Sequence, residues 1–309
     1  MRWGDFRKSD NVDDRTSGDP GGGSPMGGGG GMRLGGGALV VIVIASLIFG
    51  VNPLEMIGAL ESGAPGVPPP TQGQNAPGYG PQGSPPPPPR VANAPKDPTK
   101  DFVAAVLGDT EDVWEAVFKS IGARYEAPRL VLFRRTTQSA CGRASASAGP
   151  FYCSADRELY LDTDFFNELS RRFGAPGDFA QAYVIAHEVG HHVQNLTGTM
   201  KMVDQKMQGQ DARGRNALSV RLELQADCYA GIWGYFAQKR NKLDAGDLEE
   251  GFRAASAVGD DSIQKRAQGY VVPESFTHGS AEQRLRWFRT GLESGDFRRC
   301  NTFAAGAPN

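Results

Sequence analysis

The sequence predicts an α+β fold, in which a mainly helical domain with a small sheet follows a single membrane-spanning helix. The chain has 309 residues with 41 glycines and 21 prolines, and more than half of these lie before residue 99. An uncharged apolar stretch begins at Ala38. From Thr99 onward, apolar residues recur at the spacing of helices and strands. One folded domain is therefore expected after the first hundred residues.

Residues 1–37 and 61–98 are predicted to lack a folded core. The first segment contains glycine runs and few apolar side chains, which predicts disorder. The second contains the proline runs Pro68–Pro70 and Pro85–Pro89, which favour extended polyproline conformations. We expect it to be a semi-rigid spacer, and a ligand for a proline-binding protein is the alternative.

Residues 38–60 are predicted to cross the lipid bilayer. As a helix they would reach about 34 Å, enough for a hydrocarbon core of about 30 Å. A buried core helix and a cleaved signal peptide are the alternatives, but the flanks offer no folded partner and no clear cleavage site. Lysine and arginine precede the segment and none follows it before Arg90, which predicts that residues 1–37 are cytoplasmic and that the domain lies outside. The formal net charge of -2 gives no reason to expect a nucleic-acid partner.

The domain, residues 99–309, is predicted to place a small sheet before most of its helices. Asp178 is a candidate N-cap of its most apolar helix, and Gly198 follows the end of that helix. Strands are expected at 129–133 and 159–161. Helices are expected over 102–121, 179–196, 213–238, 247–267 and 281–292.

Four cysteines predict disulfides, because the domain is placed outside the cytoplasm, where thiols are oxidised. Of the three possible pairings we favour Cys141–Cys153 with Cys228–Cys300, since the first closes a short loop and leaves the other two to meet. Four buried free thiols are the alternative. Neither C-x-x-C nor zinc-finger spacing is present.

The segment His187-Glu188-Val189-Gly190-His191 lies within the apolar helix expected over 179–196. Side chains four residues apart share a helix face, so both imidazoles can bind one Zn²⁺ ion. Glu188 would lie beside the metal, take a proton from the attacking water and deliver it to the leaving nitrogen. Two surface histidines are the alternative, but this helix is apolar on most sides, and buried polar groups need partners. His192 lies off this face and is expected to be a supporting or surface residue rather than a ligand.

A catalytic zinc ion needs a third protein ligand and one position open for water. His278 is the only histidine outside this segment, so a carboxylate is considered first. Glu223 and Asp227 lie four residues apart among apolar neighbours in the helix expected over 213–238. We expect Glu223 to bind the metal and Asp227 to accept the outer N–H of a metal-bound histidine. Two solvated acids on a helix face are the alternative.

The pairing of HEVGHH with ELQADCYAG, the MRWGDFRKSDNVDDR start and the glycine run resemble the bacterial YpfJ-type neutral zinc metallopeptidases over nearly the whole chain. More distantly, E-x-x-A-D followed by Thr277-His278-Gly279-Ser280 and Arg284 is similar to gluzincin peptidases of the HtpX kind. The resemblance implies a zincin-like fold, Glu223 as third ligand, Asp227 behind it and His278 near the oxyanion. HtpX-type enzymes have cytoplasmic catalytic domains and several spans, so neither localisation nor substrate is implied.

The sequence therefore predicts a zinc metalloendopeptidase anchored by one span in the bacterial inner membrane, with a periplasmic domain that hydrolyses peptide or protein substrates. A non-catalytic, zinc-stabilised binding or scaffold module is the alternative. A closed structural site of that kind would have no use for Glu188. A metal-dependent amidase acting on cell-wall peptides would share the chemistry and differ in its substrate.

Overall fold

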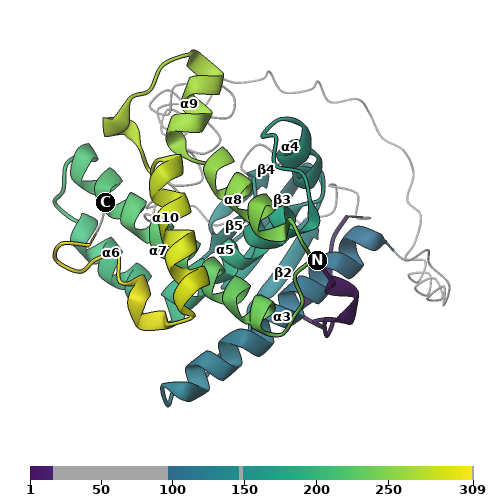
Figure 1. Ribbon diagram of the computed structural model, residues 1–309. Helices are drawn as coiled ribbons and strands as arrows, with labels where there is room; N and C mark the ends of the chain where they lie inside the picture. The colour runs from purple at the N-terminus through teal and green to yellow at the C-terminus, as the bar shows by residue number, and fades with distance from the viewer. Residues whose placement is uncertain (17–96, 146–148, 308–309) are drawn as a thin grey trace, which may run out of the picture.

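The computed structural model describes residues 1–16, 97–145 and 149–307 (Figure 1). They form a mainly helical α+β structure with a small mixed sheet, as predicted. The predicted membrane helix over 38–60 and nearly all of the spacer lie outside the described residues. Within the described residues, no helix has the length and apolar character needed to cross a membrane.

The main sheet has the strand order β1-β2-β6-β5. Its first three strands are parallel, and β5 pairs antiparallel with β6. A separate antiparallel hairpin is formed by β3 and β4. The strands are β1 (Val12–Asp14), β2 (Arg129–Phe133), β3 (Thr136–Ser139), β4 (Gly142–Ser145), β5 (Phe151–Cys153) and β6 (Glu158–Asp162).

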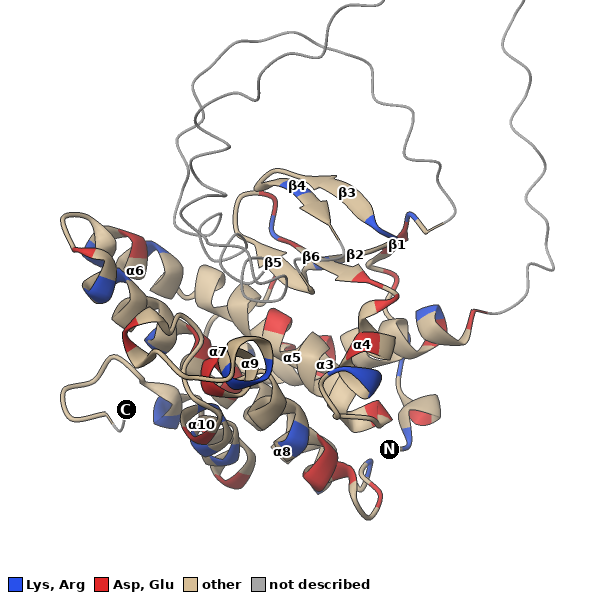
Figure 2. Ribbon diagram, turned by 90° about the horizontal axis from the view of Figure 1, so that it is seen from above, with Lys and Arg blue, Asp and Glu red and all other residues tan. Residues whose placement is uncertain are grey.

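Alternation along β2 and β6 sends their side chains to two different buried clusters. Leu130 and Leu159 join the large core formed with the helices, whereas Val131 and Tyr160 join a smaller cluster with Ala144 of the hairpin. Figure 2 shows the resulting layers, with the β3–β4 hairpin on one face of the sheet and the helices on the other. The sheet is covered on both faces, as its near-continuous apolar strands require.

Helices α3 and α5 pack next to the sheet, and α7, α8 and α10 lie beyond them (Figures 1 and 2). The crossing of α7 and α10 depends on two glycines, because a Cβ at Gly231 or at Gly291 would overlap the backbone of the other helix. The helices are α3 (Pro98–Ser120), α4 (Phe165–Arg171), α5 (Asp178–Leu196), α6 (Thr199–Met207), α7 (Ala212–Lys239), α8 (Asp247–Ala257), α9 (Asp260–Gln268) and α10 (Ala281–Ser294).

The predicted helices and strands are present, with two differences. The helix expected over 247–267 is two helices, α8 and α9, separated at Gly259, where a Cβ would overlap the backbone of Ala281. The expected N-cap Asp178 is instead the first residue of α5, after Gly177. Gly177 has a φ of 117°, which favours glycine, and the Asp178 carboxylate accepts hydrogen bonds from the amino group of Met1.

Residues 1–16 are part of the folded domain, so the predicted disorder is wrong for them. Val12 of β1 pairs with Leu130 of β2, and the buried Phe6 joins the large core. The backbone N–H of Ser9 donates to the carbonyl of Ala104 in α3 at 2.9 Å. The prediction that residues 1–37 are cytoplasmic while the domain lies outside would separate β1 from β2, whereas their pairing places residues 1–16 on the same side of a membrane as the domain.

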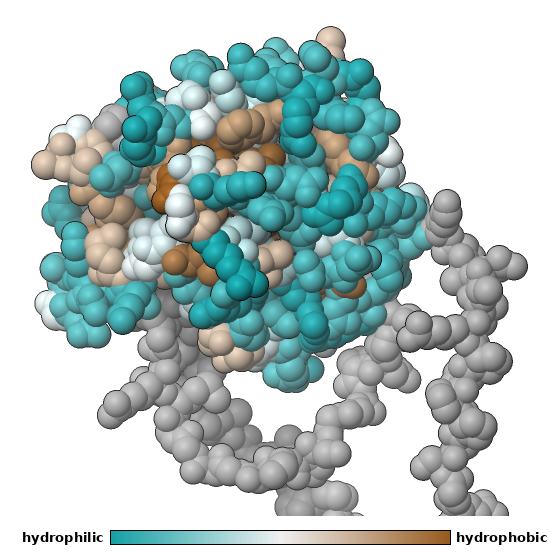
Figure 3. Space-filling view, turned by 90° about the horizontal axis from the view of Figure 1, so that it is seen from below, coloured by the Kyte–Doolittle hydropathy of each residue, from teal (hydrophilic) through white to brown (hydrophobic). Residues whose placement is uncertain are grey.

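Two disulfides connect the layers in the favoured pairing. Cys141–Cys153 joins the turn between β3 and β4 to β5, and Cys228–Cys300 joins α7 to the short helix η4 (Phe297–Cys300). All four thiols are therefore oxidised, which supports an extracytoplasmic location for the domain. The face shown in Figure 3 is mostly hydrophilic, with apolar atoms in small separate areas.

Candidate metal centre

The first two candidate ligands lie on α5, the helix between the sheet and α7. His187 and His191 are separated by one turn, so their imidazoles lie on the same helix face. Both side chains are buried, at 6% and 8% relative exposure. Alanine and valine side chains around them, including Ala182 and Val189, pack into the core. The helix is therefore held on its apolar sides, and the two histidines are left facing α7.

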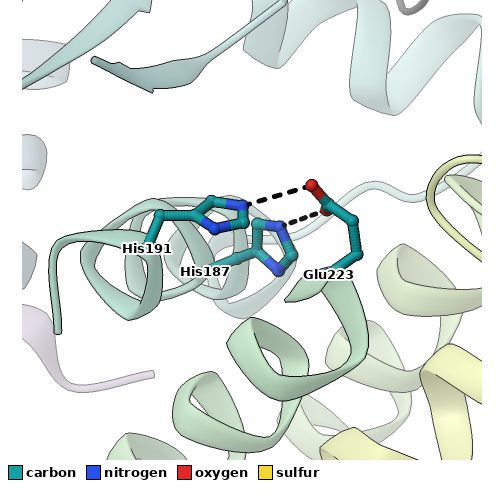
Figure 4. A group of neighbouring side chains, drawn as sticks. All are labelled: His187, His191 and Glu223. Atoms are coloured by element: carbon teal, nitrogen blue, oxygen red, sulfur yellow. Dashed lines mark hydrogen bonds and ion pairs between the residues drawn. The ribbon is translucent and has the colours of Figure 1, made fainter. Parts of the chain in front are cut away.

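The third candidate ligand, Glu223, comes from α7. This helix begins after Asp211, whose side chain accepts a hydrogen bond from the N–H of Gly214. Gly190 allows α5 and α7 to approach closely, since a Cβ at this position would be only 3.0 Å from the carbonyl oxygen of Ala226. One ligand atom from each of His187, His191 and Glu223 lies within 4.8 Å of the others, as Figure 4 shows. The structure thus brings together the three predicted ligands.

Both imidazoles present the same nitrogen to this centre. Nε2 of His187 lies 3.1 Å from Glu223 Oε2, and Nε2 of His191 lies 3.5 Å from Glu223 Oε1 (Figure 4). The Nδ1 atoms have other partners. Nδ1 of His187 lies 2.9 Å from Asp227 Oδ1, and Nδ1 of His191 lies 2.8 Å from Gln194 Oε1. Both partners are acceptors, so each Nδ1 carries a proton. Each Nε2 then faces a Glu223 oxygen, to which it donates when the ring is protonated, and a bound metal ion would take the place of that proton. Two imidazole nitrogens and a carboxylate are a donor set that zinc commonly takes.

Asp227, behind His187, is the predicted acceptor, and its carboxylate is itself held. Arg284 of α10 donates to its two oxygens at 2.9 and 3.0 Å, and the hydroxyl of Tyr183 donates to Oδ1. Burial alone would raise the pKa of Asp227, but the charges of Arg284 and His187 bring it below its ordinary value. The carboxylate therefore stays ionised and holds the imidazole of His187 in one orientation.

Glu223 is buried beside positive charge. Burial alone would raise its pKa, but attraction by His191 and His278 and hydrogen bonds from both ligand histidines bring the pKa well below its ordinary value. It is therefore a carboxylate at neutral pH, which is the form that binds a metal.

Glu188 differs from the ligands in its exposure. It is only partly buried, and its carboxylate makes no hydrogen bond to another described residue. Desolvation raises its pKa, opposed by the charges of His191 and His187. Glu188 is thus a partly exposed carboxyl group close enough to His187 and His191 for their charges to act on it.

His278 lies near Glu223 in the loop before α10 and is also buried. Asp260, the first residue of α9, fixes this loop by accepting backbone N–H groups from residues 277, 278 and 279 at 2.7, 2.7 and 3.0 Å. Its other oxygen is 3.1 Å from His278 Nδ1. The Nε2 atom of His278 is buried and has no hydrogen-bond partner among the described residues.

His192 lies outside the group formed by His187, His191 and Glu223, and it is not a surface residue. It is 1% exposed, and its nitrogens contact the hydroxyl of Tyr152 and the carbonyl of Glu126. Burial lowers its pKa to about 4, so it is a neutral residue that ties α5 to β5. Gln194, Asp260 and Tyr183 were not identified from sequence, because their partners are distant along the chain or are backbone groups without a motif.

Two buried histidines and a buried carboxylate around one centre form a group that could hold a metal ion. Residues 1–303 match the family described as "Putative neutral zinc metallopeptidase", and the chain belongs to this family. It is 42% identical over 303 residues to the uncharacterized protein YpfJ of Escherichia coli K12, covering 98% of this chain and 99% of YpfJ. It is 43% identical over 215 residues to the uncharacterized protein Rv2575 of Mycobacterium tuberculosis H37Rv, covering 66% of this chain and 72% of that protein. No solved structure matches the chain significantly.

Proposed function

We propose that the protein is a zinc metallopeptidase of zincin-like fold that hydrolyses peptide bonds, with His187, His191 and Glu223 as the zinc ligands. The convergence of three buried donor atoms within 4.8 Å carries this proposal. Two imidazoles and one carboxylate leave the fourth position of a tetrahedral ion open, as a catalytic zinc site requires.

The chain's own groups around this position fit a hydrolysis. Bound zinc would supply a Lewis acid that polarises the substrate carbonyl and makes water more acidic. Glu188 takes the proton from the attacking water and returns it to the nitrogen of the departing amine. The carboxylates of Asp260 and Glu223 raise the pKa of His278, which favours the doubly protonated ring. Its Nδ1–H then donates to Asp260, and its Nε2–H donates to the carbonyl oxygen as negative charge develops there.

A non-catalytic zinc-stabilised scaffold would use the same three ligands. Glu188 favours the enzyme, because a partly exposed carboxylate without a hydrogen-bond partner among the described residues has no role in a closed structural site. The amidase alternative shares every one of these groups, and only its substrate would differ.

We also propose that the domain works in the periplasm, which the two disulfides support. Residues 38–60, outside the described residues, are the candidate attachment to the inner membrane. Residues 1–16 would then lie on the periplasmic side together with the domain, because they form part of its sheet.

The test compares the full-length wild type with Glu188→Gln. We expect about one zinc ion per chain in both, because Glu188 is not a ligand and glutamine has nearly the same shape. Turnover of a quenched-fluorescent peptide library should fall by about 10²- to 10⁴-fold in the variant, since the proton acceptor is lost. Equal turnover in the two proteins at matched zinc content, or none in either, would favour the scaffold.

A further inference from the structure

Gln194 lies one turn after His191 on α5 and is fully buried. Its Oε1 is the atom that faces His191 Nδ1, at 2.8 Å. An amide can turn over and present its NH₂ group instead, which would force the imidazole into the other tautomer. The position of the proton on His191 therefore depends on what holds this amide.

The surroundings of Gln194 permit only one orientation. Its Nε2 lies 2.6 Å from the carbonyl oxygen of Leu222 in α7, and a backbone carbonyl can only accept. The same Nε2 lies 3.1 Å from Oε1 of Gln225. The NH₂ group must therefore face α7, which leaves Oε1 for His191.

The side-chain amide of Gln225 is also held in one orientation by a backbone carbonyl. Its Nε2 donates to the carbonyl oxygen of Cys300 at 2.9 Å, so its Oε1 must face Gln194. The second disulfide joins Cys300 to Cys228. Cys228 lies on α7, about one turn after Gln225. Two backbone carbonyls, of Leu222 and Cys300, thus orient two buried amides in series.

We propose that Gln194 is the positioning residue of His191, and that Gln225 and the disulfide-linked C-terminal turn hold Gln194 in place. The inference rests on the proposed zinc site, since it concerns which nitrogen His191 offers to the metal. His187 is oriented by a carboxylate and His191 by a neutral amide, so the two ligands of one helix have supports of different charge.

The residue at position 194 must accept a hydrogen bond from His191 and donate one to the carbonyl of Leu222. Carboxylates are common partners of metal-binding histidines and increase their basicity. Here an ionised glutamate would place its second oxygen against the acceptors Leu222 O and Gln225 Oε1, neither of which donates a proton, and protonating the carboxyl group at pH 7.5 would itself cost free energy. Rotation of Gln225 would not help, because it would turn an oxygen toward the carbonyl of Cys300. Gln194→Glu should therefore weaken zinc binding, although a carboxylate acting alone on His191 would maintain or strengthen it.

The experiment measures zinc affinity of the full-length protein by competition with a chelator at pH 7.5. We expect Gln194→Glu and Gln194→Leu each to weaken binding by about 10- to 100-fold, the usual range for loss of an outer partner. Cys228→Ser with Cys300→Ser should also weaken binding, whereas Cys141→Ser with Cys153→Ser, which removes the disulfide at the hairpin, should leave the affinity unchanged.

Unchanged or tighter binding in Gln194→Glu would overturn the inference. If the Gln194 variants do not fold, Gln225→Leu decides the question, because it leaves every group that contacts His191 in place. Weaker zinc binding by this variant supports the inference, and wild-type affinity refutes it. A wild type that binds no zinc would instead refute the proposed function.

Discussion

Replacing Gly108 with alanine tests whether residues 1–16 belong to the domain, because the sign of the stability change depends on their position. Gly108 lies inside α3, where alanine is normally more favourable than glycine by about 1 kcal/mol. Here the added methyl group would overlap the carbonyl oxygen of Arg7 and lie 2.9 Å from the amide nitrogen of Ser9. Both neighbours are backbone atoms, which cannot turn aside as a flexible side chain could.

The N-terminal segment would have to move away from α3, and its contacts would weaken. Arg7 forms an ion pair of 2.7 Å with Glu111, and the hydroxyl of Ser9 donates to the same carboxylate at 2.6 Å. Forcing an extra methyl group into a packed position costs about 1 to 3 kcal/mol. This exceeds or cancels the helical gain, so we expect a net loss of up to about 2 kcal/mol in the free energy of unfolding.

The assay is urea unfolding of the full-length protein, repeated in a chain that lacks residues 1–16. In the shortened chain the obstacle is absent, so the same substitution should stabilise α3 by about 1 kcal/mol. A stabilising effect of this size in the full-length protein would refute the packing of residues 7–9 against α3.

Three further predictions concern the metal centre and the placement of the chain. Glu223→Ala should lose zinc almost completely, whereas Asp227→Ala should weaken binding only about 10- to 100-fold, as metal analysis and chelator competition can show. His278→Ala should retain zinc but lose on the order of 3 kcal/mol of transition-state stabilisation, measured as peptide turnover at matched zinc content. Epitopes at the two ends of the chain should be digested together by protease added to intact spheroplasts, and protection of the N-terminal epitope alone would contradict the pairing of β1 with β2.

The grouping of the candidate ligands could be predicted from sequence because their positions follow from local geometry. His187 and His191, like Glu223 and Asp227, are four residues apart, and helical periodicity alone places each pair on one face. The second disulfide could be assigned only by elimination, since 72 residues separate its cysteines.

The other parts of the site depend on contacts that leave no local pattern. Asp260 accepts N–H groups from a loop seventeen residues later, and backbone donors carry no side-chain signal. Gln194 acquires its role only when α7 presents the carbonyl of Leu222. Strand β1 is a three-residue segment with two aspartates, which by composition favours a turn over a strand, so only its partner β2 identifies it.

The long sequence separation between β1 and its partner β2 affects folding. Val12 pairs with Leu130, so the first strand to be synthesised waits for more than a hundred residues before it can join the sheet. Contacts this distant along the chain form slowly, because loop closure precedes any gain from pairing. Until then β2, whose last four residues are buried in the finished protein, has an unpaired edge. Such an edge is a template for pairing with other chains, so proteolytic loss of the first sixteen residues should make this domain prone to aggregation.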